Sequence, residues 1–371
     1  MDIPNWDYRL VIHKQKYMKL LFFLLILPGV VLSQKYKKDA NEILNSSFNN
    51  GPGCAALISV NGNTEYTYCT GKANIELDVP IKLEHKFRIG SMTKQFTAIG
   101  IMILQEQGKL NVNDSIQKYI PDFPVKNHTV TIEHLLTHTS GIKSYTIPEI
   151  MDENFMRIYH HPDSLVMSFS EYPLEFVPGS KFSYSNSGYH LLGLIIEKAS
   201  GKSYSSFIKK EIFEKAGMKD SRTDSNKEII KNRISGYDPF IGPVNAQYID
   251  MSIPYSAGNI ISTVSDINLW YQALFNYEIV GKQTLNKAHT PYELSDGKTS
   301  NYAYGWGLDT IQGQPVIRHS GGIPGFLSNG IYFTEQKLLT VVLSNCTCNP
   351  PQESSGKIAE LAIEEYLDKN K

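Results

Sequence analysis

Ser91 and Lys94 are the two residues whose types and spacing most directly suggest covalent chemistry. At the start of a helix, residues three apart share a face, so the lysine amine can reach the serine hydroxyl. A serine hydroxyl needs a base to become a strong nucleophile, and burial favours the neutral lysine that can act as that base. The free N–H groups at a helix start also suit an oxyanion, although Ser91 could equally be only a helix N-cap.

The run Tyr184-Ser185-Asn186 adds two candidate site residues on a turn-rich loop before a helix. Loops of this kind commonly carry binding and catalytic residues. A tyrosine oxygen can relay protons when nearby cations lower its pKa, and an asparagine amide can orient both a lysine and a substrate. The sequence therefore predicts that Tyr184 and Asn186 assist the reactive pair, with ordinary loop chemistry as the alternative.

The run His319-Ser320-Gly321-Gly322 ends a predicted strand. A strand edge beside a nucleophile can hold an extended substrate through backbone hydrogen bonds, and the glycines permit close approach. The backbone N–H near Gly322 could complete an oxyanion hole with the N–H of Ser91. We therefore predict that this run binds substrate.

Hydrophobic patterns place strands at both ends of the chain and helices between them. We predict an α+β fold, in which an antiparallel sheet flanked by helices is built from both chain ends around a mostly helical inserted domain. The expected domains are a leader at 1–33, an α/β domain from 34–90 and 300–371, and a helical domain at 91–299 carrying the nucleophile. The expected strands are 54–60, 64–70, 315–319, 326–333 and 338–343, and the expected helices 91–107, 188–199, 204–215, 266–275 and 358–367.

The order of these motifs resembles the serine β-lactamase and penicillin-binding-protein superfamily. Ser91-x-x-Lys94, Tyr184-x-Asn186 and His319-x-Gly321 are similar to the class C β-lactamase branch, with its D,D-peptidases, D-aminopeptidases and esterases. The resemblance covers about residues 45 to 365, including further runs at 135–141, 184–193, 256–263, 304–307 and 319–325. It implies a β-lactamase/D,D-peptidase-like fold and hydrolysis through an acyl-enzyme, with no metal or organic cofactor.

The resemblance also implies a role for each site residue. Ser91 would be the acylated nucleophile, and Lys94 and Tyr184 would together carry its proton to the leaving group. Asn186 would position them, and the N–H groups of Ser91 and Gly322 would form the oxyanion hole. The expected partner is a small-molecule or peptidoglycan-peptide substrate.

His319 departs from the class C pattern, in which Lys-Thr-Gly stands in place of His319-Ser320-Gly321. A neutral histidine binds a carboxylate less strongly than a lysine does, which argues against efficient antibiotic hydrolysis. We expect a cell-wall D-alanyl peptide first, an ester or D-aminoacyl amide second, and a β-lactam third. A non-catalytic sensor that binds peptidoglycan or β-lactams is the alternative from a different functional class.

Other functional sites have less support. His134 and His138 are four residues apart and could share a helix face as metal ligands, but the resemblance makes this segment a turn beside the site. No serine has glycine two positions before and two after it, so the α/β-hydrolase elbow is absent. A formal net charge of −1 over 371 residues gives no sign of nucleic-acid binding.

The N-terminal segment has the pattern of an export signal. Lys19 precedes the apolar run Leu20–Leu27, and small or neutral residues follow to Ser33. We expect a signal peptide with its core at 18–33, a secreted or periplasmic product, and no stable membrane span after cleavage. The alternatives are an uncleaved membrane anchor and a true start at Met18.

The four cysteines could form disulfides in an exported chain. If Val60 pairs with Asn63 across the turn Asn61-Gly62, Cys54 lies opposite Cys69, and a bridge there is as well supported as free thiols. Cys346 and Cys348 are too close in sequence for an easy mutual bridge. Three triplets match glycosylation acceptors, which matter only in a eukaryotic secretory pathway, at Asn45, Asn127 and Asn345.

Overall fold

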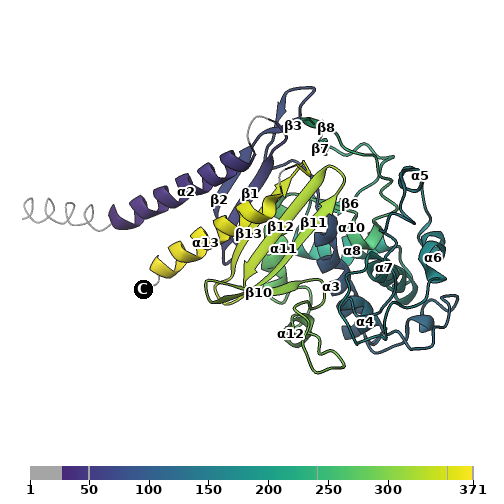
Figure 1. The fold of residues 1–371 in the computed structure, drawn as a ribbon. Coiled ribbons are helices and arrows are strands. Elements are labelled where there is room, and N and C mark those ends of the chain that lie inside the picture. The colour runs from purple at the N-terminus through teal and green to yellow at the C-terminus, as the bar shows by residue number, and fades with distance from the viewer. Residues whose placement is uncertain (1–26, 49–50, 240, 349, 370–371) are drawn as a thin grey trace, which may run out of the picture.

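The computed structural model describes residues 27–48, 51–239, 241–348 and 350–369. Its largest sheet is antiparallel and has the strand order β10-β11-β12-β13-β1-β2 (Figure 1). The first and last of the described strands, β1 and β13, pair with each other, so one sheet is built from segments near both chain ends. The predicted fold class is confirmed. The strands are β1 (Cys54–Val60), β2 (Asn63–Thr70), β10 (Gly307–Ile311), β11 (Gln314–Ile323), β12 (Phe326–Phe333) and β13 (Leu338–Ser344).

Helices cover both faces of this sheet. α2 (Leu27–Ser47) and α13 (Pro351–Lys369) pack against each other on one face (Figure 1). Ala56 of β1 belongs to the core beneath them, whereas its neighbour Ala55 belongs to the larger core on the other face, with α11 (Val264–Phe275). Because both faces are covered, β1 and β13 are almost entirely buried and show no alternation of polar and apolar residues.

α3 (Thr93–Glu106) is the central helix of the larger core. All residues from Thr93 to Leu104 are buried, so the helix is surrounded by protein. The 3-10 turn η1 (Gly90–Met92) precedes it and contacts β11 and β12 of the sheet. Ser91 therefore lies where the sheet meets the helices. The neighbours of α3 are α7 (Asn186–Ser200), α8 (Tyr204–Ile208), α10 (Tyr255–Gly258) and α12 (Lys282–Ala288).

Several short elements connect these helices and strands. A three-stranded sheet of β5 (Phe87–Arg88), β9 (Ile260–Ser262) and β6 (Arg222–Thr223) leads into η1. The other elements are β3 (Lys72–Asn74), β4 (Val79–Pro80), β7 (Tyr237–Pro239), β8 (Pro243–Asn245), α4 (Ile132–Leu136), α5 (Glu153–Arg157), α6 (Pro162–Ser170), α9 (Glu214–Ala216), the 3-10 turn η2 (Ile116–Lys118) and the π turn η3 (Lys209–Phe213).

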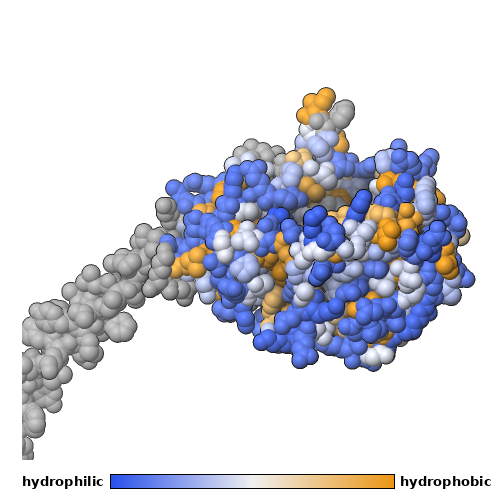
Figure 2. All heavy atoms as spheres, turned by 60° about the horizontal axis from the view of Figure 1, so that its bottom comes forward, coloured by the Kyte–Doolittle hydropathy of each residue, from blue (hydrophilic) through white to orange (hydrophobic). Residues whose placement is uncertain are grey.

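Hydrophilic side chains dominate the face of the molecule shown in Figure 2, and apolar residues appear there in small groups.

The β1–β2 hairpin leaves Cys54 and Cys69 as free thiols. The predicted pairing of Val60 with Asn63 is present, but the register then skips Glu65, so that Cys54 faces Thr70. An extra residue on one strand is a β-bulge, and it moves every later pair by one position. The predicted alignment of the two cysteines is therefore wrong.

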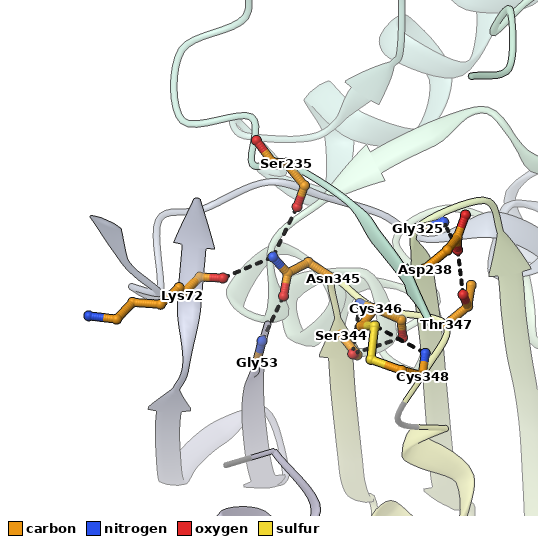
Figure 3. Close-up of a disulfide and its surroundings, with 10 residues drawn as sticks. All are labelled: Gly53, Lys72, Ser235, Asp238, Gly325, Ser344, Asn345, Cys346, Thr347 and Cys348. Carbon is orange, nitrogen blue, oxygen red and sulfur yellow. Dashed lines mark hydrogen bonds between the residues drawn. A yellow bond between two sulfur atoms is a disulfide. The ribbon is translucent and has the colours of Figure 1, made fainter. Parts of the chain in front are cut away.

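Cys346 and Cys348 form a disulfide, contrary to the expectation that they are too close in sequence (Figure 3). The chain leaves β13 at Ser344 and turns, which places the two Cα atoms 5.2 Å apart. That separation lies within the range of disulfide-bonded cysteines. The turn after β13, which the sequence reading overlooked, makes the short bridge geometrically accessible.

Asn345 joins three separate segments and is fully buried. Its Oδ1 accepts from the backbone N–H of Gly53 at 2.8 Å, and its Nδ2 donates to the carbonyls of Lys72 and Ser235 at 3.0 and 2.9 Å (Figure 3). Both the oxygen and the nitrogen of the side-chain amide are therefore hydrogen-bonded within the protein. Asn345 is a structural residue, and its side chain is not accessible as a glycosylation acceptor.

The N-terminal expectations fall partly outside the described residues. The predicted signal core at 18–33 overlaps α2, which begins at Leu27, and its first part precedes the described chain. Among the described helices, none has the length and apolar character needed to cross a membrane. The signal peptide and the domain boundaries stay predictions.

Candidate active site

Ser91 sits on a turn that is pressed against β11. Gly90, immediately before it, has φ +50°, and a Cβ there would lie 2.7 Å from the backbone nitrogen of Gly322. Glycine adopts this φ readily and has no Cβ to collide with the strand. A Cβ on Gly321 would likewise lie 1.9 Å from the carbonyl oxygen of Ile89. These glycines allow the close approach that brings Ser91 beside the predicted substrate-binding strand.

Lys94 is fully buried one helical turn after Ser91. Its Nζ is 3.0 Å from Ser91 Oγ, 2.8 Å from Asn186 Oδ1 and 2.8 Å from the carbonyl oxygen of Ala257. Burial removes water from the ammonium and holds the pKa of Lys94 well below its usual value. The amine can therefore be neutral at ordinary pH and accept a proton from the serine hydroxyl.

Asn186, the first residue of α7, is held by a loop from the other side of the site. Its Nδ2 donates to Thr146 Oγ1 at 3.0 Å, and its backbone N–H donates to Ser144 Oγ at 3.1 Å. Ser144 Oγ and Thr146 Oγ1 are themselves 2.8 Å apart. Because Thr146 takes the amide nitrogen, the amide oxygen faces Lys94.

Tyr184 stands at the mouth of the site and is 39% exposed. Its ring centroid is 4.9 Å from Lys94 Nζ, and its hydroxyl lies near the Ser91 side chain. Protein atoms around the hydroxyl raise the pKa of Tyr184, and the nearby Ser91 side chain lowers it only in part. The expected lowering by a cation is thus not found, because removal of water from the Tyr184 hydroxyl is the larger effect. The phenol retains its proton in the free protein.

His319 is buried and uses both ring nitrogens within the protein. Its Nδ1 is 2.6 Å from the carbonyl oxygen of Ser320, so Nδ1 must carry the proton, and Nε2 then accepts from Tyr302 Oη at 2.8 Å. Burial and the neighbouring Lys94 lower the pKa of His319 to about 3. A neutral histidine with both nitrogens engaged offers no free donor to a substrate carboxylate.

The end of β11 leaves one edge open among the described residues. β12 pairs with β11 as far as Ile323, whereas β10 pairs with it only as far as Arg318. The backbone of the run from His319 to Gly322 is therefore paired with β12 alone. Ser320 and Gly322 are exposed along this segment, which leaves the backbone accessible to an extended substrate as predicted.

A small pocket of about 100 Å³ opens beside Ser91, with Asn186 and Gly322 in its wall. Most of the remaining wall is apolar. The pocket is much smaller than sites for drug-sized ligands, which span roughly 300–1,000 Å³. Its apolar lining comes mainly from Tyr145, Met151, Ile249, Ile253, Ile323 and Pro324.

The structure brings all the predicted site residues to one place and adds others that the motifs did not identify. Thr146 orients Asn186, and Tyr302 orients His319. Both lie in segments whose sequence pattern did not indicate a functional role. Ala257 contributes a backbone carbonyl to Lys94, and carbonyl contacts leave no side-chain signature. Residues 256–263 resemble a run found in the family, so this resemblance could have identified the loop that carries Ala257.

His138 packs behind Tyr184 and the start of α7. Its Nδ1 accepts from the backbone N–H of Ser185 at 3.1 Å, and its ring lies 4.2 Å from that of Tyr184. Burial holds the pKa of His138 well below its usual value. The nearby His134 Nδ1 accepts from the backbone N–H of Thr131 in a helix cap. Across the described residues, no cluster of three or more metal-ligating side chains occurs.

Comparison with known proteins agrees with this geometry. The sequence model of the family described as Beta-lactamase matches residues 46–364. Penicillin-binding protein 4* from Bacillus subtilis (strain 168) is 32% identical over 78% of this chain and 67% of its own length. The chain spans about two thirds of the length of the curated relatives it matches.

Two solved structures share both fold and sequence similarity. The octameric penicillin-binding protein homologue from Pyrococcus abyssi has a TM-score of 0.77 and 29% identity, covering 89% of this chain and 77% of that one. The penicillin binding protein from Bacillus halodurans has a TM-score of 0.75 and 27% identity, covering 88% of this chain and 99% of that one.

Proposed function

This chain belongs to the β-lactamase family of serine hydrolases, and from that premise we propose that it cleaves an amide or ester through an acyl-enzyme on Ser91. One observation carries the proposal: a fully buried lysine amine lies 3.0 Å from the Ser91 hydroxyl. Burial depresses the pKa of that amine. The pair therefore combines a nucleophile with a base that is neutral when it is needed.

In the first step, Lys94 takes the proton of Ser91 while Ser91 Oγ bonds to the substrate carbonyl carbon. The carbonyl oxygen becomes an oxyanion, which the N–H groups of Ser91 and Gly322 stabilise. The bond to the leaving group then breaks, and Tyr184 gives its proton to the departing nitrogen or oxygen. Lys94 then passes the proton that it took from Ser91 to Tyr184, so both groups regain their starting protonation states.

In the second step, water attacks the acyl-enzyme and replaces the leaving group. The same groups act in reverse: Tyr184 and Lys94 accept the proton of the water, and Ser91 Oγ regains a proton as it leaves. Asn186 keeps Lys94 aligned throughout, because its Oδ1 accepts from the amine at 2.8 Å. The products are a free acid and an amine or alcohol.

For the substrate we propose a D-alanyl peptide or a related amide or ester. Support comes from the open edge of β11, which suits a peptide backbone, and from the similarity to penicillin-binding protein 4*. The alternatives are a β-lactamase or esterase on the same fold, and a sensor that binds peptidoglycan or β-lactams without releasing an acyl group.

The test compares the purified chain with Ser91→Ala on four substrates: a D-alanyl-D-alanine peptide, a D-amino acid amide, a p-nitrophenyl ester and benzylpenicillin. The proposal expects turnover of at least one substrate by the unmodified chain and none by the variant. Equal turnover by both proteins would overturn it. A stable adduct that is never released would instead support the sensor.

We also propose that the chain is exported, as a secreted or periplasmic protein. The proposal rests on Lys19 and the apolar run Leu20–Leu27. N-terminal sequencing of protein recovered from outside the cytoplasm would test it. A start near residue 34 is expected, and an intact leader on the recovered protein would favour the membrane anchor.

A further inference from the structure

A second cavity, of about 230 Å³, lies behind one wall of the pocket in the candidate active site. Residues 249–259 form part of both walls: Ile249 and Ile253 line the pocket, whereas Asp250 and Asn259 line the cavity. The two spaces have no lining residue in common. The cavity is therefore separate from the site of the chemistry, although one chain segment borders both.

The side chain of Asn259 in the cavity wall lacks a hydrogen-bond partner. The residue is only 7% exposed, and its Oδ1 accepts no hydrogen bond from the described part of the chain. Its backbone, by contrast, bonds to Asp224 at 2.7 Å and to Tyr255 at 2.9 Å. A buried polar group without a partner is rare, because it costs free energy. A half-turn of the amide can direct either its oxygen or its nitrogen toward a ligand.

The charged groups in the wall include one free cation and one free carboxylate. Lys227 is exposed, and no carboxylate among the described residues pairs with it. Asp250 accepts from a backbone N–H at 2.9 Å but has no cation beside it within the same described ranges. Asp224 is already paired, with Arg88 at 2.7 Å and Arg233 at 2.8 Å. The groups open to a ligand are thus of both signs, with an amide between donor and acceptor in character.

Tyr159 adds an apolar surface beside these polar groups. It is 59% exposed, and Lys227 Nζ lies 5.5 Å from its ring centroid. An aromatic ring presents a flat apolar face to its surroundings. A sugar ring matches this combination, because its C–H bonds form an apolar face and its hydroxyl groups both donate and accept hydrogen bonds.

From these features we propose that the cavity binds one neutral sugar residue. A volume of about 230 Å³ is below the roughly 300–1,000 Å³ of sites for drug-sized ligands, which favours a single ring. A ligand with a net charge of either sign would meet one repelling group, Asp250 or Lys227. The proposal is independent of the proposed function, since no step of that reaction uses the cavity.

Saturation-transfer NMR on the full chain tests the proposal. The probes are N-acetylglucosamine and glucose, which are neutral sugars, and taurine, a zwitterion that could use the free cation and carboxylate alone. We expect saturable binding of at least one sugar with a Kd of about 1–10 mM, as is typical of ligands with so few atoms. Taurine should bind at least about tenfold more weakly.

Asn259→Leu separates a binding role from a structural one. The leucine side chain is similar in size but cannot hydrogen-bond, so sugar binding should weaken by about tenfold. Without sugar the variant should be at least as stable as the unmodified chain, because an unpaired buried amide has been removed. Asn276→Leu, at an exposed position, is the matched control and should leave sugar binding unchanged.

Tyr159→Ala tests the apolar face at a position where folding is not at risk. Sugar binding should again weaken by about tenfold. Tyr172→Ala is the matched control, because Tyr172 is also exposed, has Lys143 Nζ 4.9 Å from its ring centroid and does not line the cavity. Ser91→Ala should bind the sugar as the unmodified chain does.

Each contrary result has a distinct meaning. Absence of saturable binding of both sugars up to about 100 mM, or tighter binding of taurine, would overturn the proposal. Equal sugar binding by Tyr159→Ala and the unmodified chain, or loss of binding in Ser91→Ala, would place the sugar elsewhere and overturn it as well. If Asn259→Leu fails to fold, the comparison of Tyr159→Ala with Tyr172→Ala decides.

Discussion

Lys94 is the residue on which the chemistry depends, because its environment favours the neutral amine. Within the described part of the chain no carboxylate pairs with it: its three hydrogen-bond partners are the Ser91 hydroxyl, the Asn186 amide oxygen and the Ala257 carbonyl. Neutral acceptors compensate a buried positive charge far less than a carboxylate would. The arrangement therefore supports a base rather than an ion pair.

Lys94→Arg tests the need for a neutral base. A guanidinium stays protonated at any practical pH, so we expect kcat/KM to fall by about 1,000-fold or more, a loss typical of removing a catalytic base. Lys298→Arg, at an exposed position, is the matched control. Near-normal activity of Lys94→Arg with native circular dichroism would mean that another group takes the proton.

The pH dependence of kcat/KM follows from the same residue. The pKa of Lys94 in the folded protein lies well below its usual value, so the neutral base is present above that pKa. Activity should fall about tenfold per pH unit as the pH drops through it and the amine becomes charged. Because the pKa of His319 is about 3, His319→Asn should not move this acid limb. A shift of the limb in that variant would contradict the assignment.

At the scale of elements, the loop that carries Ser144 and Thr146 acts as a support for the start of α7. It fixes both the backbone and the side chain of Asn186. This contact was not predicted, because residues 142–178 show no clear periodicity and a threonine in such a loop has no distinctive pattern. By contrast, the strands 326–333 and 338–343 were predicted closely, since apolar, aromatic and β-branched residues predominate in both.

Thr146→Val should weaken catalysis without removing it. The isosteric change deletes the acceptor for Asn186 Nδ2, so the amide can turn away from Lys94. We expect kcat to fall about tenfold, equivalent to one hydrogen bond, and the acid limb of the pH profile to move. Thr146→Ser keeps the hydroxyl, so it should retain both the kcat and the position of the acid limb of the unmodified chain. A fall in kcat with an unmoved limb would indicate a merely structural role.

At the scale of the whole molecule, the sheet depends on joining the two chain ends. The sequence indicated this arrangement because strand patterns occur near both termini and helical patterns lie between them. It did not indicate how the ends are locked together. Asn345 does so through bonds to Gly53, Lys72 and Ser235, three partners that are far apart in sequence and include two backbone carbonyls without any side-chain signature.

Asn345→Ala should lower the free energy of unfolding by about 2–4 kcal/mol, because it leaves several buried backbone groups without partners. Chemical denaturation measures the change. Asn276→Ala, at an exposed position, is the control and should alter stability by less than about 0.5 kcal/mol. Equal stability of the two variants would show that the junction does not hold the sheet together.

The most direct test of the central claim is mass spectrometry of the chain after rapid quenching with p-nitrophenyl butanoate. The account predicts one added butanoyl group per chain, located on the peptide that contains Ser91. The adduct should be absent from Ser91→Ala and present in a Ser320→Ala control. Release of p-nitrophenol by Ser91→Ala at the rate of the unmodified chain, or a butanoyl group on another residue, would contradict the account.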